Sequence, residues 1–364
     1  MDSPYTNELQ TAIAVIRQAA KLSQAVISAE DKGVIEKDDL SPVTVADFAI
    51  QALLTATIHA AFPGDRFVGE ETSADLRSNP VLLERVWALL RRLDHDVAEG
   101  RCKIPESPDQ ACEMIDWCGS GVPGGPQSGR VWVFDPIDGT KTFVLGQAYA
   151  INVALLEGGK QVLSAVGCPT LPASPQGHLS NDTVDPTGRG SLISAVRGYG
   201  TFVRPLFGSP EEVEGHRIQP QPDTASLAGL RGVTCFKTLA SGVDDAHEAI
   251  MEKMGIPFPG SDLLGWVPRW VTLGLGVANV TVWVYKNRER HGKLWDHAGA
   301  MLLFEEVGGK ITDIDGKDID LTVGRIMSAN CGFVAAPKNV HHEVLRIVQE
   351  TLKEQNKSHL LAAP

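Results

Sequence analysis

A run of apolar residues ends abruptly in two aspartates and a glycine near the middle of the chain, in the segment 131–140, VWVFDPIDGT. The apolar residues predict a buried strand that carries Asp135 at its end, and the proline and Gly139 then turn the chain sharply. Asp135 and Asp138 can converge on a pair of hard cations, and the amides of Gly139 and Thr140 can face a phosphate. A solvated turn is the alternative, since Asp, Pro and Gly all favour turns.

Three further carboxylates lie beside predicted helices or strands. Glu70 follows a short predicted strand, and Asp296 comes directly before an apolar helical run over 298–304. Asp47 falls in the first turn of a predicted helix that Thr44 can cap, as in a capping box. Each has an ordinary structural explanation: an exposed acidic pair, a helix cap or a helix-start carboxylate. Individually, none of these positions indicates a function.

Chain length and charge limit the kinds of partner. The 364 residues suffice for one large domain or two intimately packed ones, and 43% hydrophobic with 21% charged residues is an ordinary globular composition. The formal net charge of -12 predicts a surface that repels nucleic acid and anionic membranes. A small anionic substrate is still compatible with this charge, because bound metal ions can reverse the field locally.

The cysteines and the first residues indicate a reducing compartment. Six cysteines are scattered without any C-x-x-C spacing, so we expect reduced thiols and neither a disulfide framework nor a zinc site. The first residues, MDSPYTNELQ, lack a basic start and an apolar core, and no stretch approaches the length that spans a bilayer. We therefore expect a cytoplasmic protein.

Hydrophobic patterning predicts a layered α/β architecture. Apolar residues at helical spacing predict a helix over 8–28, and 151–169 is typical of a hairpin. From about residue 225, predicted strands and helices alternate, and the last residues, from 353 on, are expected to fray. We expect an N-terminal α+β metal-binding part over 1–190 and a C-terminal α/β part over 191–364 that completes the active site.

In combination, the acidic segments carry a family resemblance. Asp47, Glu70, 135–140 and Asp296 occur in the order and contexts typical of the inositol-monophosphatase superfamily of lithium-sensitive phosphatases. From about residue 8 to 345, the chain is similar to the 3′(2′),5′-bisphosphate nucleotidase branch, fungal members especially, through KDDLSPVTVADFAIQ, VGEE, FDPIDGTKTF, AVRGYGTF and WDHAGAMLLFEEVGG. The long interval between Glu70 and Asp135 suits this branch. The resemblance implies a sugar-phosphatase fold in which helix and sheet layers alternate.

The resemblance also implies a set of metal ligands. Glu70, Asp135 and the Ile137 carbonyl would hold a first Mg²⁺, and Asp135, Asp138 and Asp296 would hold a second. Two or three ions are expected in all, and Li⁺ and Ca²⁺ are expected to inhibit. Oxygen ligands alone select a hard cation rather than zinc.

Two further residues are implied in catalysis. Asp47 and Thr140 match the pair that polarises the attacking water in the family, with Asp47 accepting a proton from the Thr140 hydroxyl. The amides of Gly139 and Thr140 would face the substrate phosphate. A helix-start carboxylate and a turn hydroxyl are the structural explanations for this pair, and both can coexist with catalysis.

The substrate pocket departs from the nucleotidase pattern. Nucleotidases carry a histidine, a D-S-x-x-K-Y segment and an arginine that bind adenosine and its second phosphate. The corresponding positions here are 237–242, which lacks histidine, 266–271, and Trp283. Arg269 can replace the lysine charge. Trp266, Trp270 and Trp283 are either core aromatics or the lining of a pocket for a flatter, more apolar ester.

These features predict a Mg²⁺-dependent phosphomonoesterase acting on a small-molecule phosphate ester, as a monomer or homodimer. The first candidate substrate is the 3′-phosphate of adenosine 3′,5′-bisphosphate, with the related PAPS. An inositol phosphate or a biosynthetic intermediate with a more apolar group is the alternative. A non-catalytic sensor of a phosphorylated ligand is a third possibility, against which the Asp47–Thr140 pair argues.

Overall fold

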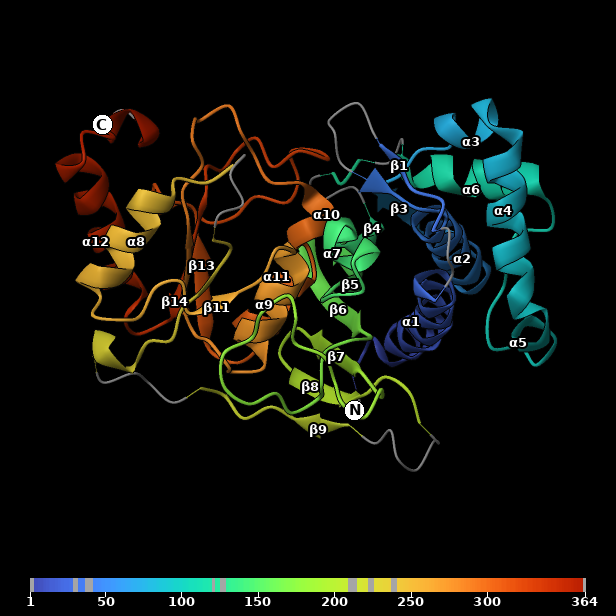
Figure 1. Ribbon diagram of the computed structural model, residues 1–364, viewed down its shortest axis with the longest axis horizontal. Helices are drawn as coiled ribbons and strands as arrows, with labels where there is room; N and C mark the ends of the chain where they lie inside the picture. Colours follow the sequence, from blue (N-terminus) through green and yellow to red (C-terminus); the bar gives the residue numbers. More distant parts are fainter. Residues whose placement is uncertain are drawn as a thin grey trace.

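Seven strands form one mixed sheet in the middle of the molecule (Figure 1). The computed structural model describes residues 3–28, 32–36, 42–119, 122–124, 129–208, 215–221, 226–236 and 241–362. Strand order is β3-β4-β5-β6-β7-β8-β9, with β3 and β4 parallel and the other neighbours antiparallel. The strands are Arg66–Gly69, Arg130–Asp138, Ala150–Glu157, Lys160–Cys168, Ser191–Val196, Gly200–Pro205 and His216–Arg217.

Two long helices cover one face of this sheet. Helix α1 (Thr6–Ile27) packs on β6, and α2 (Val45–Ala61) packs on β4 and on α1. All residues of α2 from Val45 to Ile58 are buried, because α4 (Pro80–Leu90) and α6 (Pro108–Gly119) cover its outer side. Two short helices, α3 (Ala74–Ser78) and α5 (Asp94–Ala98), complete this end of the molecule in Figure 1.

Helices α9 (Trp266–Gly274) and α11 (Ala300–Glu305) cover the opposite face and separate the large sheet from a smaller one. The smaller sheet has the order β12-β14-β13, formed by Thr281–Trp283, Phe333–Pro337 and Gly309–Thr312. Beyond it, α8 (Asp244–Lys253) and α12 (His341–Glu354) pack together at the far end (Figure 1). Helix and sheet layers therefore alternate, which confirms the predicted layered α/β sandwich.

Short elements complete the chain and place the acidic residues. Helix α7 (Thr140–Val144) follows Asp135 and Asp138, and the short helix α10 (Leu294–His297) contains Asp296. Strands β1 and β2 form an antiparallel pair, β10 and β11 a parallel one, and their bounds are Ile35–Glu36, Pro42–Val43, Val233–Thr234 and Ser261–Asp262. Within the described ranges, no helix is both long enough and apolar enough to cross a membrane.

The expected division at residue 190 falls between two hydrogen-bonded strands of one sheet. Residues of β6 pair with β7 across it, as Gly167 does with Leu192. The large sheet extends to Arg217, so the change from its strands to the layers of the second half comes after β9.

The expected fraying of the last residues is wrong up to residue 362. Leu360 is buried, and its carbonyl accepts a hydrogen bond of 2.7 Å from Arg288 Nη1. All six cysteines are buried and outside any disulfide, as predicted.

Candidate metal centre

The last residues of β4 place two aspartates on one side of the large sheet. Asp135 lies opposite Asn152 of β5, and a register shift between Asp135 and Asp138 marks the point where the strand leaves the regular ladder. Gly139 has φ +88°, and a Cβ there would lie 2.8 Å from Thr142 Oγ1, so the turn requires glycine. The local pattern of an apolar strand broken by a glycine turn is thus present as predicted.

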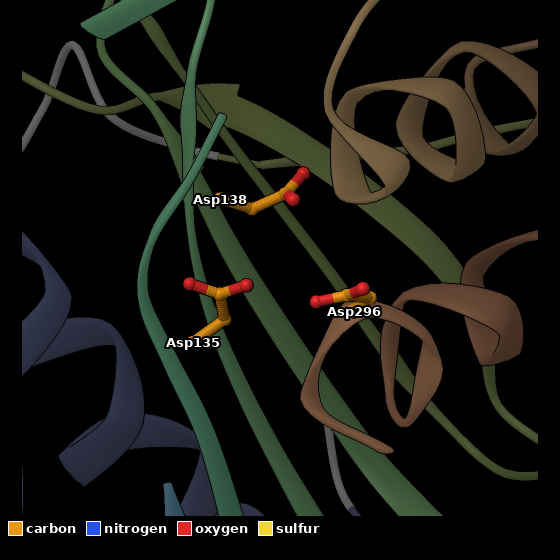
Figure 2. A group of neighbouring side chains, drawn as sticks. All are labelled: Asp135, Asp138 and Asp296. Atoms are coloured by element: carbon orange, nitrogen blue, oxygen red, sulfur yellow. The ribbon is translucent and has the colours of Figure 1, made fainter. Parts of the chain in front are cut away.

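Asp296 joins these two aspartates from a distant part of the chain. Asp135, Asp138 and Asp296 each offer a carboxylate oxygen, and these oxygens all lie within 4.8 Å of one another. Figure 2 shows the three carboxylates, two from β4 and one from α10, facing a common space. Three carboxylates at such spacing are a ligand set typical of hard divalent cations.

A buried asparagine fixes α10 against the sheet. Asn152 Nδ2 donates to the carbonyls of Trp295 at 2.8 Å and Ala298 at 2.9 Å, on either side of Asp296. Since Asn152 is the register partner of Asp135, one side chain links both ligand-bearing segments. A polar residue inside the apolar run AINVALL was the signal in the sequence that could have identified it.

The N-terminus of α9 stabilises Asp138. The backbone amide of Val267 donates to Asp138 Oδ2 at 2.7 Å, and the Trp266 amide also interacts with this carboxylate. A Cβ at Gly265 would lie 2.5 Å from Asp138 Oδ2, so the close approach requires glycine there. Free amides at a helix start favour a negative charge. Local sequence patterns carry no sign of this contact, because it joins residues about 130 positions apart.

The carboxylates raise one another's pKa values. Burial, followed by the charges of Glu70, Asp138 and Asp296, raises the pKa of Asp135 well above its usual range. Burial raises the pKa of Asp138 to about 7, although the Val267 amide and Arg269 oppose the rise. Burial and the charges of Asp138 and Glu70 raise the pKa of Asp296 as well. Glu70 therefore lies close enough to act on the three aspartates.

A glutamine of α2 holds the Glu70 segment. Gln51 Nε2 donates to the Glu71 carbonyl at 2.8 Å, and its Oε1 accepts from the Glu71 amide at 2.9 Å. Gln51 is fully buried in the apolar stretch ADFAIQALL, where a polar residue was again the available signal. The segment that follows β3 is thereby tied to the helix that carries Asp47.

Asp47 serves as the helix-start carboxylate that the sequence allowed. Its Oδ2 accepts hydrogen bonds of 2.7 Å from both the amide and the hydroxyl of Thr44, which completes the predicted capping box. The Asp47 charge also contributes to the raised pKa of Asp135. The Thr140 hydroxyl donates to the Ile137 carbonyl at 3.1 Å. Both residues lie beside the aspartates, and their joint role in catalysis stays a prediction.

Two of the three tryptophans that were candidates for the pocket lining are core residues. Trp270 and Trp283 are 0% and 1% exposed, and Trp270 Nε1 donates to His297 Nδ1 at 3.1 Å. Neither lines a solvent-open pocket, which corrects that alternative for these two side chains. Trp266, at the first turn of α9, is partly exposed and adjoins Asp138. It remains the candidate for contact with a substrate.

Arg269 is buried beneath Trp266. Its guanidinium carbon lies 3.7 Å from the ring centre of Trp266 and 4.8 Å from that of Trp283. Nε and Nη2 donate to the carbonyls of Gly265 at 3.2 Å and Leu264 at 3.0 Å. The expected histidine position overlaps 237–240, which lies outside the described residues.

Comparison with known proteins assigns the chain and its fold to one family. The model of the inositol monophosphatase family matches residues 5–353. The chain belongs to this family. Its sequence is 35% identical over 354 residues to a 3′(2′),5′-bisphosphate nucleotidase of Emericella nidulans, covering 96% of this chain and 99% of the relative. It is 34% identical to the Schizosaccharomyces pombe enzyme of that name, covering 94% of both chains.

Solved structures of the inositol monophosphatase family share the fold. An IMPase of Thermotoga maritima superimposes with a TM-score of 0.60 at 21% identity, covering 96% of this chain and 99% of that one. Inositol monophosphatase II of Staphylococcus aureus superimposes with a TM-score of 0.56 at 18% identity, covering 96% of both chains. The predicted resemblance to the family and to its bisphosphate nucleotidase branch is confirmed, and with it the prediction of a phosphoric monoester hydrolase.

Proposed function

We propose that this chain is a Mg²⁺-dependent phosphomonoesterase that hydrolyses a small phosphate ester at a two-metal centre. The observation that carries the proposal is the convergence of Asp135, Asp138 and Asp296, with Glu70 near enough to raise their pKa values. Four carboxylates without cations repel one another, and two divalent ions would balance their charge. Inositol monophosphatase family membership supports the same reading.

The chain's own residues fit this chemistry. Asp135, Glu70 and the Ile137 carbonyl would hold one ion, and Asp135, Asp138 and Asp296 the other. The ions would supply a nucleophilic water and neutralise charge on the attacking and leaving oxygens. The Ile137 carbonyl accepts from Thr140, so the hydroxyl predicted to act on the water lies directly beside a predicted ligand.

Asp47 and Thr140 would move the proton. We infer that the Thr140 hydroxyl accepts a proton from the attacking water and passes its own to Asp47, which burial and two Thr44 hydrogen bonds hold in place. The amides of Gly139 and Thr140 would bind the phosphate at the start of the turn. These groups are in a sharp, glycine-dependent turn, which limits their motion.

The first candidate substrate is the 3′-phosphate of adenosine 3′,5′-bisphosphate, together with PAPS. Relatives named 3′(2′),5′-bisphosphate nucleotidase, at 30–35% identity over nearly the whole chain, support it. A second candidate is a phosphate ester whose alcohol is planar or apolar. It is favoured because Arg269 is buried under Trp266 and donates to two backbone carbonyls, whereas Trp266, whose backbone amide interacts with Asp138, is a partly exposed residue.

A panel of phosphate esters, assayed for hydrolysis in the presence of Mg²⁺, tests both the phosphatase activity and the identity of the substrate. Turnover of p-nitrophenyl phosphate that chelation stops and Mg²⁺ restores is expected of the enzyme, and its absence would favour the ligand sensor. If Arg269 does not reach the second phosphate of the bisphosphate, and the basic residues that nucleotidases carry there are absent, two charge-assisted hydrogen bonds to that phosphate are missing. Each is worth about 1.5–3 kcal/mol. The KM for the bisphosphate would then be about a hundredfold or more above that of a nucleotidase retaining those cations.

The variant Trp266→Ala distinguishes between the two candidate substrates. Aromatic contacts are worth about 0.5–1.5 kcal/mol, so an aryl ester should lose about two- to tenfold in kcat/KM if Trp266 contacts it. Trp87→Ala, which removes another partly exposed tryptophan from α4, is the matched control. A low-micromolar KM for adenosine 3′,5′-bisphosphate in the wild type would instead establish the nucleotide and exclude the apolar alternative.

A further inference from the structure

Arg325 connects segments that meet at the metal centre, although it is not itself a predicted metal ligand. It lies between β13 and β14 and is half-buried. Its Nη1 donates to the Cys118 carbonyl at 2.7 Å, and its Nη2 donates to the Glu70 carbonyl at 3.3 Å. The side chain thus ties the last turn of α6 to the residue that carries a predicted metal ligand.

The same arginine also contacts α10. Its guanidinium carbon lies 4.7 Å from the ring centre of Trp295, the residue before Asp296. Its backbone carbonyl accepts a hydrogen bond of 3.0 Å from the Leu294 amide. Arg325 therefore donates a guanidinium hydrogen bond to the Glu70 segment. It contacts the Asp296 segment through the face of the guanidinium and through its own backbone carbonyl.

The contacts suit arginine and no other side chain. Carbonyls in the last turn of a helix lack partners within that helix, and the planar guanidinium presents several donors while its face packs on an aromatic ring. A lysine ammonium has neither the fork nor the flat face. Asn152 links α10 to Asp135, and Gln51 links Glu71 to α2, but neither side chain joins Glu70 to α10.

We propose that Arg325 is a positioning residue that fixes the Glu70 segment relative to α10, so that Glu70 and Asp296 reach the bound ions together. The inference rests on the proposed metal centre. Without this link, the two ligand-bearing segments would be related through the strands of the large sheet and held by separate side chains, Gln51 for the Glu70 segment and Asn152 for α10. Both would still fold, but with more freedom between the two carboxylates.

Metal binding to the protein freed of metal by chelation tests the proposal. Mn²⁺, observed by electron paramagnetic resonance, is the probe, and Mg²⁺ competes with it. Residues that orient metal ligands typically contribute about 10- to 100-fold to metal affinity, so we expect Arg325→Lys and Arg325→Met to weaken Mn²⁺ and Mg²⁺ binding by that factor. The kcat for p-nitrophenyl phosphate at saturating Mg²⁺ should fall less than the metal affinity.

Arg231→Lys is the matched control. Arg231 also donates to two backbone carbonyls, those of Val277 at 3.0 Å and Gly276 at 2.9 Å, but it touches none of the ligand-bearing segments described above. We expect it to leave metal affinity unchanged. Melting temperatures of the metal-free proteins report on any purely structural effect.

The outcomes separate the inference from the proposed function. A wild type that binds neither ion would refute the metal centre itself. A wild type that binds metal, with Arg325 variants of equal affinity, would overturn the role of Arg325 even if their melting temperatures fall. An equal loss in Arg231→Lys would overturn it too. If Arg325→Met does not fold, Arg325→Lys decides the question, because it keeps the charge and removes the fork.

Discussion

Replacing Asp138 by asparagine should stabilise the metal-free protein, and increasingly so as the pH rises. Asp138 is 8% exposed, and burial raises its pKa from 3.8 to about 7. Between these values the folded chain keeps a proton that the unfolded chain releases, so the free energy of unfolding falls as pH rises. Since one pKa unit corresponds to about 1.4 kcal/mol, the wild type loses about 4 kcal/mol between pH 4 and pH 7 through this carboxyl. The side-chain amide in Asp138→Asn would keep an acceptor for the Val267 amide and would not ionise.

Thermal unfolding after chelation, recorded for wild type and Asp138→Asn from pH 5 to pH 8, measures this effect. Burial lowers the pKa values of His247 and His297, so these two groups make the free energy of unfolding rise with pH. They do so equally in both proteins, and their effect cancels when the two melting temperatures are subtracted. The difference in melting temperature should grow by several degrees toward neutral pH. Asp75→Asn, on the exposed surface of α3, controls for the loss of one negative charge. A difference that is constant or shrinks with pH would refute the electrostatic account of the site.

The same geometry makes three other predictions. Asp135→Asn should abolish turnover of p-nitrophenyl phosphate, because Asp135 would contact both ions, whereas Asp296→Asn should keep a trace of activity at high Mg²⁺. Li⁺ should inhibit at concentrations where Na⁺ has little effect, and Ca²⁺ should inhibit because it relaxes the octahedral geometry; equal responses to Li⁺ and Na⁺ in a steady-state assay would contradict this. Asn152→Leu should lower the melting temperature and weaken Mn²⁺ binding about tenfold or more, because the carbonyls of Trp295 and Ala298 lose their donor. Unchanged Mn²⁺ affinity would exclude this role of Asn152.

Local signals in the sequence predicted the elements that carry the carboxylates. The break from apolar residues to Asp-Pro-Ile-Asp-Gly is a property of neighbouring residues, and the turn with φ +88° at Gly139 follows from it. The capping box of Thr44 and Asp47 is likewise a matter of three positions. The family resemblance rested on the order of the acidic segments, and the comparisons confirm the family itself.

Long-range packing decided the features that the sequence left open. Whether a tryptophan is a core residue or a pocket residue depends on what covers it, and Trp270 contacts His297 of α10 and Phe333 of β14. The pairing of β6 with β7, on either side of the expected division at residue 190, is likewise not visible in hydrophobic patterning. Asn152, Gln51 and Arg325 each bond to backbone far along the chain, so residue type alone could not assign them a partner.

The contrast between this site and another buried aspartate, Asp96, supports a cation as the ligand of these carboxylates. Burial raises the pKa of Asp96, but hydrogen bonds from Lys21 and Arg101 bring it below the usual range, so the fold itself stabilises the charge. Asp138 receives two amides and the field of Arg269, yet its pKa still rises to about 7. Within the described chain, the groups that act on Asp135 and raise its pKa are other carboxylates. The fold keeps these carboxylates together through Asn152 and the start of α9, although their charge is only partly compensated by the groups around them. Such a site is organised around a ligand of opposite charge, and oxygen donors at this spacing suit a hard divalent ion.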